Sequence, residues 1–245
     1  MQKILLIAIL IMASLSSCNK ANKDGFQIDV NINDIPNGRQ VILKKQVDRQ
    51  VVNVDTTTIE NGKFTFKGSI KEPIIFGIFI DSIKRGGLFP FIDVNDHIVI
   101  TANKDSLQKA KMTGSKLNDE LTKMRKKREV LTAESQKYFP EYQKANQEKD
   151  TASINRINKA IKKISNKIAA NDWDFVKKNP NSYVAPMIFN GLMTNPTYKD
   201  SVKIVFNTFS EKIKKSELSK PIRDYFDYLE KQNKPVTPKE EVGKK

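Results

Sequence analysis

The hydrophobic periodicity of this 245-residue chain changes once, near residue 113. From Phe26 up to that point, apolar and polar residues alternate with a period of two, which is typical of strands that bury one face. Beyond it, apolar residues recur at steps of three and four, which is typical of amphipathic helices. The order of the two patterns predicts an α+β chain in which the β part comes first.

Short β-rich runs separated by turn residues fill the first part of the chain. They are FQIDVNI, RQVILKKQV, VVNVDTTTI, KFTFKGSI, IIFGIFID, GLFPFIDV and HIVITANK. Asn37-Gly38 and Asn61-Gly62 lie between runs, and such dipeptides tolerate the positive φ of tight hairpins. We therefore expect an antiparallel β-sandwich or small barrel over residues 26–112.

The second part of the chain contains two apolar runs with helical spacing. The first is Leu117, Leu121, Met124 and Leu131, and the second is Ile154, Ile157, Ile161, Ile164 and Ile168, with a polar break at Lys149 and Asp150 between them. The break predicts a long antiparallel helical hairpin within an all-α domain over residues 113–233. The isoleucines have the spacing of a coiled-coil seam, so self-association is an alternative. Packing inside the chain is favoured because the first run is close in sequence.

Further helices are expected toward the C-terminus. One helix ends before Pro180, another begins near Ser182, and amphipathic runs follow at residues 202–213 and 218–229. Residues 234–245 are rich in proline and charge, which predicts a linker or tail.

Three aromatic residues in this region, Trp173, Phe175 and Tyr183, have two interpretations. They are a ligand platform or part of the core. The core is the more usual place for aromatic residues at helical spacing, and we expect them there.

The first 17 residues have the layout of a secretory signal. Lys3 precedes an apolar run at residues 4–13, and small residues follow. The run is much shorter than the ~20 apolar residues that a membrane-spanning helix needs. We expect residues 1–17 to be a signal peptide that is removed.

Cys18 is the only cysteine of the chain, and it follows that signal directly. Leu15-Ser16-Ser17-Cys18 resembles the lipobox of bacterial lipoproteins, in which the cysteine becomes the first mature residue and carries diacylglycerol and an amide-linked acyl chain. The alternative is a free or buried thiol beside an ordinary signal peptide, which leaves an odd cysteine in an exported chain unexplained. We expect lipidation at Cys18, with residues 18–25 as a tether.

The formal net charge is +15 at pH 7. An exported lipoprotein does not normally meet nucleic acid, so we expect no such partner. Envelope proteins, peptides, acidic glycans and anionic headgroups are better candidates, and a solvated basic surface is the alternative. The basic segment KMRKKR, residues 123–128, has the same two interpretations, of which the solvated helix face is favoured.

Residues suited to catalysis are scarce. His97 is the only histidine, with no cysteine beside it and no second histidine to share a metal, so a structural or surface role is favoured over a general base. Asp93, Asp96 and Asp105 do not have the spacing of a calcium loop. The sequence has no Cys-x-x-Cys, Gly-rich phosphate loop or zinc spacing, so we predict no catalytic residue, cofactor or metal.

Several segments carry a resemblance to a known family. The lipobox, VDTTTIENGKFTFKGSI, GSKLNDEL, KKNPNSYVAPMIF and FSEKIKKSELSKPI together resemble an uncharacterised N-terminal region, a domain of unknown function, of lipoproteins of the TlpA- or ResA-like thiol-disulfide interchange and AhpC/TSA-like (peroxiredoxin-like) class. In that family, a small β-domain and a helical segment precede a thioredoxin-fold domain with Cys-x-x-Cys. This sequence has no thioredoxin domain and no such cysteine pair, so the reductase activity transfers to no residue here.

Two functional hypotheses follow. The first is a non-catalytic binding or accessory lipoprotein of the cell envelope, held in the membrane by Cys18. Because Asn19 rather than aspartate follows the cysteine, the expected location is the outer membrane, facing the periplasm. The alternative is the N-terminal part of a thiol-disulfide oxidoreductase whose active site lies beyond Lys245 or on a partner, since Val242-Gly243-Lys244 resembles the start of the family's thioredoxin domain.

Overall fold

The computed structural model describes residues 25–232 except 49, 82 and 85. Within that range the chain divides into two compact units. Residues up to 71 and residues 76–114 form the β unit, and residues 72–75 and those from 115 onward form the helical unit. The expected signal peptide, the lipidation site Cys18 and the expected tail at 234–245 lie outside the described residues.

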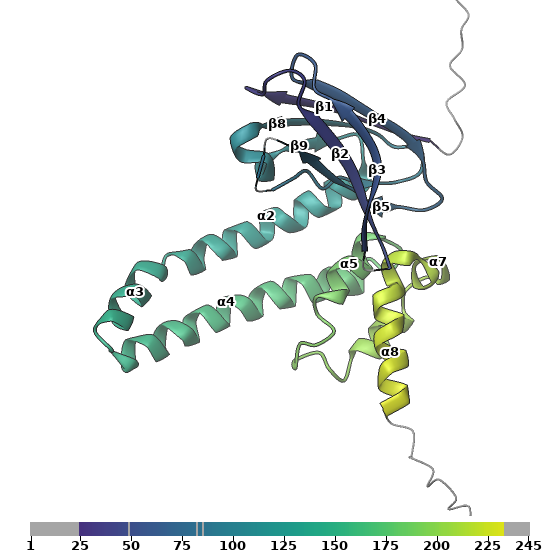
Figure 1. Ribbon diagram of the computed structural model, residues 1–245. Helices are drawn as coiled ribbons and strands as arrows, with labels where there is room; N and C mark the ends of the chain where they lie inside the picture. The colour runs from purple at the N-terminus through teal and green to yellow at the C-terminus, as the bar shows by residue number, and fades with distance from the viewer. Residues whose placement is uncertain (1–24, 49, 82, 85, 233–245) are drawn as a thin grey trace, which may run out of the picture. The chain divides into compact units, whose positions relative to one another are not determined.

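The β unit contains a four-stranded sheet with the order β4-β1-β8-β9 and a three-stranded sheet with the order β3-β2-β6 (Figure 1). The elements are β1 (Gly25–Asn33), β2 (Gln40–Val47), β3 (Gln50–Thr58), β4 (Lys63–Ser69), β6 (Gly77–Ile80), β7 (Phe91–Ile92), β8 (His97–Asn103), the 3-10 helix η1 (Lys104–Lys109) and β9 (Lys111–Thr113). Most of the predicted runs correspond to strands. β9 was not predicted, because three residues are too few to show a period.

Alternation along the strands builds the core of this unit, as the sequence predicts. On β1, Phe26, Ile28, Val30 and Ile32 are at most 5% exposed, and the residues between them are polar. Strands β8, β4, β2 and β6 also bury alternate apolar residues. Each such side chain stabilises the fold by about 1.5–3 kcal/mol relative to an exposed one.

The β unit is not wholly antiparallel, which corrects the expectation. β1 pairs antiparallel with β4 but parallel with β8, with Gln27 opposite His97 and Asn33 opposite Asn103. Between β1 and β8 the chain enters the three-stranded sheet twice, at β2–β3 and at β6, and returns to the four-stranded sheet at β4 in between. A period of two shows which face of a strand is buried and says nothing about the direction of its neighbour.

The two turn dipeptides behave differently. Asn61 and Gly62 both have positive φ, at 51° and 74°, and form the tight two-residue turn that was predicted. Both dipeptides connect strands of different sheets, β3 to β4 at Asn61-Gly62 and β1 to β2 at Asn37-Gly38. Asn37-Gly38 was expected in a hairpin and is not in one, whereas the Asn61-Gly62 turn is closed by the bridge between Glu60 and Lys63. Of Asn37 and Gly38, only Gly38 has positive φ. The β2–β3 hairpin turns instead after Val47, where Asp48 has a φ of 47°.

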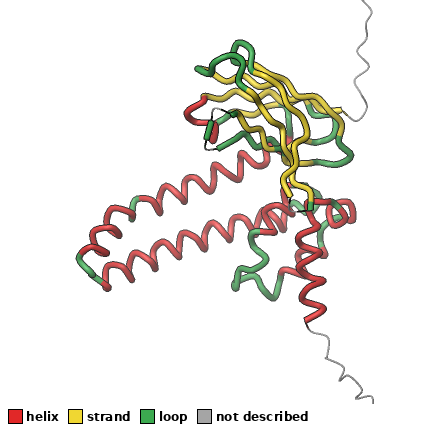
Figure 2. The backbone as a smooth tube through the Cα atoms, viewed as in Figure 1, coloured by secondary structure: helices red, strands yellow, loops and turns green. Residues whose placement is uncertain are grey.

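The helical unit begins with the predicted hairpin (Figure 2). Its elements are β5 (Ile74–Ile75), α2 (Lys116–Gln136), α3 (Phe139–Gln147), α4 (Thr151–Lys178), α5 (Val184–Asn190), α6 (Val202–Asn207), α7 (Glu211–Lys215), η2 (Glu217–Ser219) and α8 (Lys220–Gln232). None of these described helices is long and apolar enough to cross a membrane.

The isoleucine seam of α4 packs inside the chain. Helices α2 and α3 both contact α4, and Ile157 and Ile164 are buried there. The hairpin reverses at Lys149, whose φ is 55°, and Asp150 caps α4 by accepting a hydrogen bond from the Ser153 amide at 3.1 Å. This confirms the intramolecular interpretation of the seam.

The C-terminal part of the unit has an aromatic core. Trp173 stacks on Tyr198, with ring centroids 4.3 Å apart and planes at 11°, and also on Phe189. Trp173 and Tyr183 are buried and Phe175 is half-buried, so these residues belong to the core as expected. The single run expected at residues 202–213 is two helices, α6 and α7, because the chain turns between them at Phe209 and Ser210.

Candidate functional site

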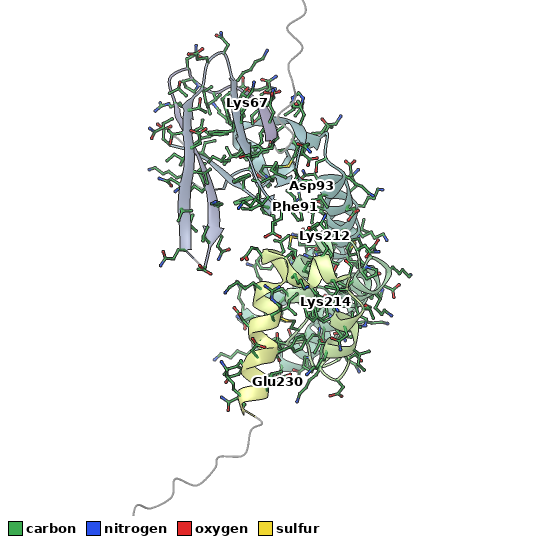
Figure 3. All side chains as sticks on the ribbon, turned by 90° about the vertical axis from the view of Figure 1, so that its right-hand side faces the viewer. Lys67, Phe91, Asp93, Lys212, Lys214 and Glu230 are labelled. Atoms are coloured by element: carbon green, nitrogen blue, oxygen red, sulfur yellow. The ribbon has the colours of Figure 1, made fainter. Side chains whose placement is uncertain are left out.

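The outer surface of the four-stranded sheet carries polar side chains in place of the apolar ones that face the core. We call this surface the polar face. Its polar residues are Gln27, Asp29, Asn31 and Asn33 on β1, Lys63, Thr65 and Lys67 on β4, and His97, Thr101 and Asn103 on β8. One apolar residue, Val99 on β8, is also exposed on this face, opposite Asp29. Lys67 is labelled in Figure 3.

Asp29 is the centre of the polar face. Its Oδ2 accepts hydrogen bonds from His97 Nε2 at 2.6 Å and from Gln27 Nε2 at 2.8 Å. Its Oδ1 accepts one from the Thr65 hydroxyl at 2.7 Å. Three strands thus converge on one carboxylate, which is held in a single orientation.

The electrostatics of Asp29 follow from these contacts. Partial burial by itself raises the pKa of the carboxyl group. The hydrogen bonds from His97, Thr65 and Gln27, with the charge of His97, act in the opposite direction and leave the pKa below its ordinary value. Asp29 is therefore an ionised acceptor at neutral pH, and His97 must donate to it through Nε2. The other ring nitrogen of His97, Nδ1, is then available to hydrogen-bond to a ligand, since the His97 side chain is 60% exposed.

Strand register brings these residues together. Asp29 lies opposite Thr65 in the antiparallel pair, and Gln27 lies opposite His97 in the parallel pair. The backbone at His97 is supported by Gly114, whose φ is 92° and where an added Cβ would lie 2.1 Å from the His97 carbonyl oxygen. Only glycine fits at position 114 without moving the end of β8.

The polar face continues into a hollow of about 450 Å³ at the end of the sheet. It is lined by Asn31, Ile32, Asn33, Asp34, Ile35, Asn37, Asn61 and Gly62. The Asn37 side chain accepts from the Asn61 amide at 2.7 Å, and Asn103 donates to Asp34 at 3.3 Å. Gly62 permits the Asn61 turn to approach the sheet, since an added Cβ would be 2.6 Å from the Ile32 carbonyl oxygen.

Fixed amides, hydroxyls and one oriented imidazole on an open sheet suit recognition through hydrogen bonds. Such groups can bind sugar hydroxyls or peptide backbone without covalent chemistry. Lys63 and Lys67 add positive charge beside them. Asp29 accepts three hydrogen bonds already, so its role here is to orient His97.

The residues singled out from the sequence fall in different places. His97 lies in a strand, as predicted, but its partner Asp29, 68 residues earlier, was not identified. Asp93 and Asp96 stabilise a local turn, in which the Asp93 amide donates to Asp96 at 2.9 Å. Among the described residues, no three histidine, cysteine or acidic side chains are grouped so that they could hold a metal ion.

The basic segment at residues 123–128 lies on α2. Arg128 donates to the buried Asp172 on α4 at 2.5 Å, whereas Lys123, Lys126 and Lys127 are exposed. One member of the segment is thus structural, and the lysines face solvent.

A second, shallow hollow of about 600 Å³ lies in the helical hairpin. Its lining is mostly apolar and includes Phe139, Tyr142 and Ile161, and Phe139 is 61% exposed. It brings no titratable pair together, so the polar face is the better candidate site.

Comparison with known proteins bears on the same part of the chain. Residues 26–121 match the model of a domain of unknown function. The matching family model is DUF4369. The matched residues cover the strands that build the polar face, apart from Gly25 at the start of β1, and the first residues of α2. Comparison with curated proteins and with solved structures found no match.

Proposed function

We propose that this chain is a lipoprotein of the cell envelope, anchored through Cys18, whose β unit binds a polar ligand without catalysis. The observation that carries the proposal is the polar face, on which Asp29 orients His97 beside a row of amides. The signal-like residues 1–17 and the lipobox that ends at Cys18 support the anchor. The expected surroundings are the outer membrane and the periplasm.

The chemistry of the polar face favours a glycan or an extended peptide segment of an envelope protein. Asn31 and Asn33 each offer a donor and an acceptor, which is the pairing that sugar hydroxyls and peptide groups need. Lys63 and Lys67 favour an acidic version of either ligand.

A binding measurement tests the ligand part of the proposal. The chain from residue 19 to 245 is titrated calorimetrically with soluble peptidoglycan fragments and with polygalacturonate. We expect one of these probes to bind, and Asn31→Ala with Asn33→Ala to weaken binding by about tenfold or more, the loss of two hydrogen-bonding side chains. Asn53→Ala on the exposed β3 is the matched control. Binding of neither probe, or equal losses in both variants, would contradict the proposal.

An intact mass tests the anchor. The native protein is extracted from its own membranes, and we expect a chain that begins at Cys18 and carries diacylglycerol and an acyl chain. An unmodified Cys18 would remove the lipoprotein part of the proposal.

A second candidate function is the N-terminal part of a thiol-disulfide oxidoreductase. It is favoured by the resemblance of the quoted segments to the N-terminal region of thiol-disulfide interchange lipoproteins, which runs through both units. The same intact mass decides between the two, because a mass larger by a thioredoxin-sized domain would indicate the oxidoreductase.

A further inference from the structure

Helix α4 contains a long stretch without acidic residues. Between Asp150, which caps the helix, and Asp172 there are 21 residues with no aspartate or glutamate. The same stretch holds Arg156 and four lysines, Lys159, Lys162, Lys163 and Lys167. We call these four lysines the lysine row.

The lysine row is exposed and follows one side of the helix. Lys159, Lys163 and Lys167 are four residues apart, so they lie along a line of about 12 Å, and Lys162 lies next to that line. All four are exposed, whereas Ile157 and Ile164 of the same helix are buried. Because the isoleucines hold α4 against the rest of the hairpin, the row is fixed on a rigid element.

Some other cations of the helical unit have partners within the described residues. Lys212 lies over the Tyr183 ring and Lys214 pairs with Glu211 at 2.5 Å, both on α7 (Figure 3). Arg156 pairs with Glu141. Among the described residues, no ion pair is found for any member of the lysine row.

The basic segment of α2 differs from the row in its surroundings. Residues 123–128 are flanked by Asp119 and Glu120 on one side and by Glu129 and Glu134 on the other, so α2 carries charges of both signs. A surface of mixed sign attracts a distant anion weakly, whereas an unmixed row of like charge attracts it strongly. Of the two basic segments, the row on α4 presents the more uniform positive charge.

We propose that the lysine row docks α4 on the surface of an anionic lipid bilayer. Several cations in one line on a rigid helix match many phosphates spread over a plane, and each lysine near such a surface strengthens attachment. The choice of a bilayer rests on the proposed function, because a chain lipidated at Cys18 has a tether of only a few residues before β1 at Gly25. Its folded part would then stay close to a membrane throughout.

Vesicle binding tests this proposal without the lipid anchor. The chain from residue 19 to 245, which contains every described residue, is co-sedimented with vesicles of phosphatidylcholine and with vesicles that also contain phosphatidylglycerol. We expect binding only to the anionic vesicles, and a decrease as the salt concentration rises. Absence of binding to the anionic vesicles would overturn the proposal.

A charge-matched pair of variants locates the surface. The first changes Lys159, Lys162, Lys163 and Lys167 to Gln, and the second changes Lys104, Lys109, Lys199 and Lys231 to Gln. All eight positions are exposed, and glutamine keeps the helix propensity of lysine. We expect the first variant to bind several hundredfold more weakly, since each of the four lysines contributes about fivefold, and the second to change little. Equal losses would mean that only net charge matters, which overturns the proposal.

Competition separates the bilayer from a soluble acidic polymer. The proposal fails if excess polygalacturonate displaces the chain from vesicles and the chain's binding to polygalacturonate also depends on the lysine row. The occupant of the row would then be a polymer. If vesicle binding persists, the proposal is supported. The chain used in the vesicle experiment carries no lipid, so the result does not depend on the intact mass that tests Cys18. Failure of the docking surface and failure of the anchor can therefore be told apart.

Discussion

The two candidate surfaces of this protein are assembled in different ways. On the polar face, Asp29 meets Thr65 from 36 residues away and His97 from 68 residues away, because β1 pairs with both β4 and β8. On α4, the lysine row spans nine residues of one continuous helix. The polar face therefore exists only in the complete fold of the β unit, whereas the row requires little more than a helix with one buried side.

The largest expected effect comes from breaking the core beneath the polar face. Phe66 on β4 is 1% exposed, and we expect Phe66→Ala to lower the free energy of unfolding by about 3–5 kcal/mol. Denaturant unfolding measures this loss, and hydrogen exchange should show weaker protection in β1, β4 and β8. Val51→Ala, at a position that is 67% exposed, is the control and should cost under about 0.5 kcal/mol. If α4 lost protection to the same degree, the two surfaces would not be independent.

A pair of glycine variants tests how closely the polar face depends on distant backbone contacts. Gly114→Ala combines a φ of 92° with a collision at the His97 carbonyl oxygen, so we expect a loss of about 2 kcal/mol or more. Gly38 has a φ of 78° but open space around it, so Gly38→Ala should cost about 1 kcal/mol from backbone strain alone. Thermal and denaturant unfolding give both values. Equal losses in the free energy of unfolding would show that the close approach to the His97 carbonyl oxygen does not exclude a side chain at position 114.

The helical unit also has contacts between residues that are far apart in the sequence. Arg128 on α2 and Asp172 on α4 are 44 residues apart, and Asp172 is only 7% exposed. Arg128→Ala removes the guanidinium that pairs with the Asp172 carboxylate. We expect the free energy of unfolding, measured with denaturant, to fall by about 1–3 kcal/mol. Lys127→Ala, one residue earlier and exposed, should stay within about 0.5 kcal/mol. Matching losses would argue against a structural role for the pair.

The smallest expected effect is the pH dependence of Asp29. A carboxyl group whose pKa is lower in the folded chain stabilises the fold above its unfolded pKa of about 3.9 and loses that contribution as pH falls through the folded value. Asp29→Asn should therefore reduce stability by under about 1 kcal/mol at pH 7 and have a smaller effect near pH 3. Unfolding curves at the two pH values measure this. An equal effect at both would mean that the ionised carboxylate is not what His97, Thr65 and Gln27 stabilise.

How much the sequence predicted depends on the range of the interaction. The helical hairpin, its reversal at Lys149 and Asp150, and the end of a helix before Pro180 all follow from neighbours within a few residues. The tight turn at Asn61 and Gly62 follows from local backbone preference. His97 was correctly placed in a strand, but nothing near it in the sequence pointed to Asp29.

The sequence by itself determined the α+β order, the buried alternation of the strands, the isoleucine seam and the charge pattern of α4, because each depends on side-chain periodicity along one segment. Only the tertiary structure decided that β1 and β8 run parallel, that Asn37-Gly38 joins two sheets, and that Asp29, Thr65 and His97 share one surface. Strand direction and partner choice are set by how distant segments bury their faces together, and a period of two is the same for every possible partner.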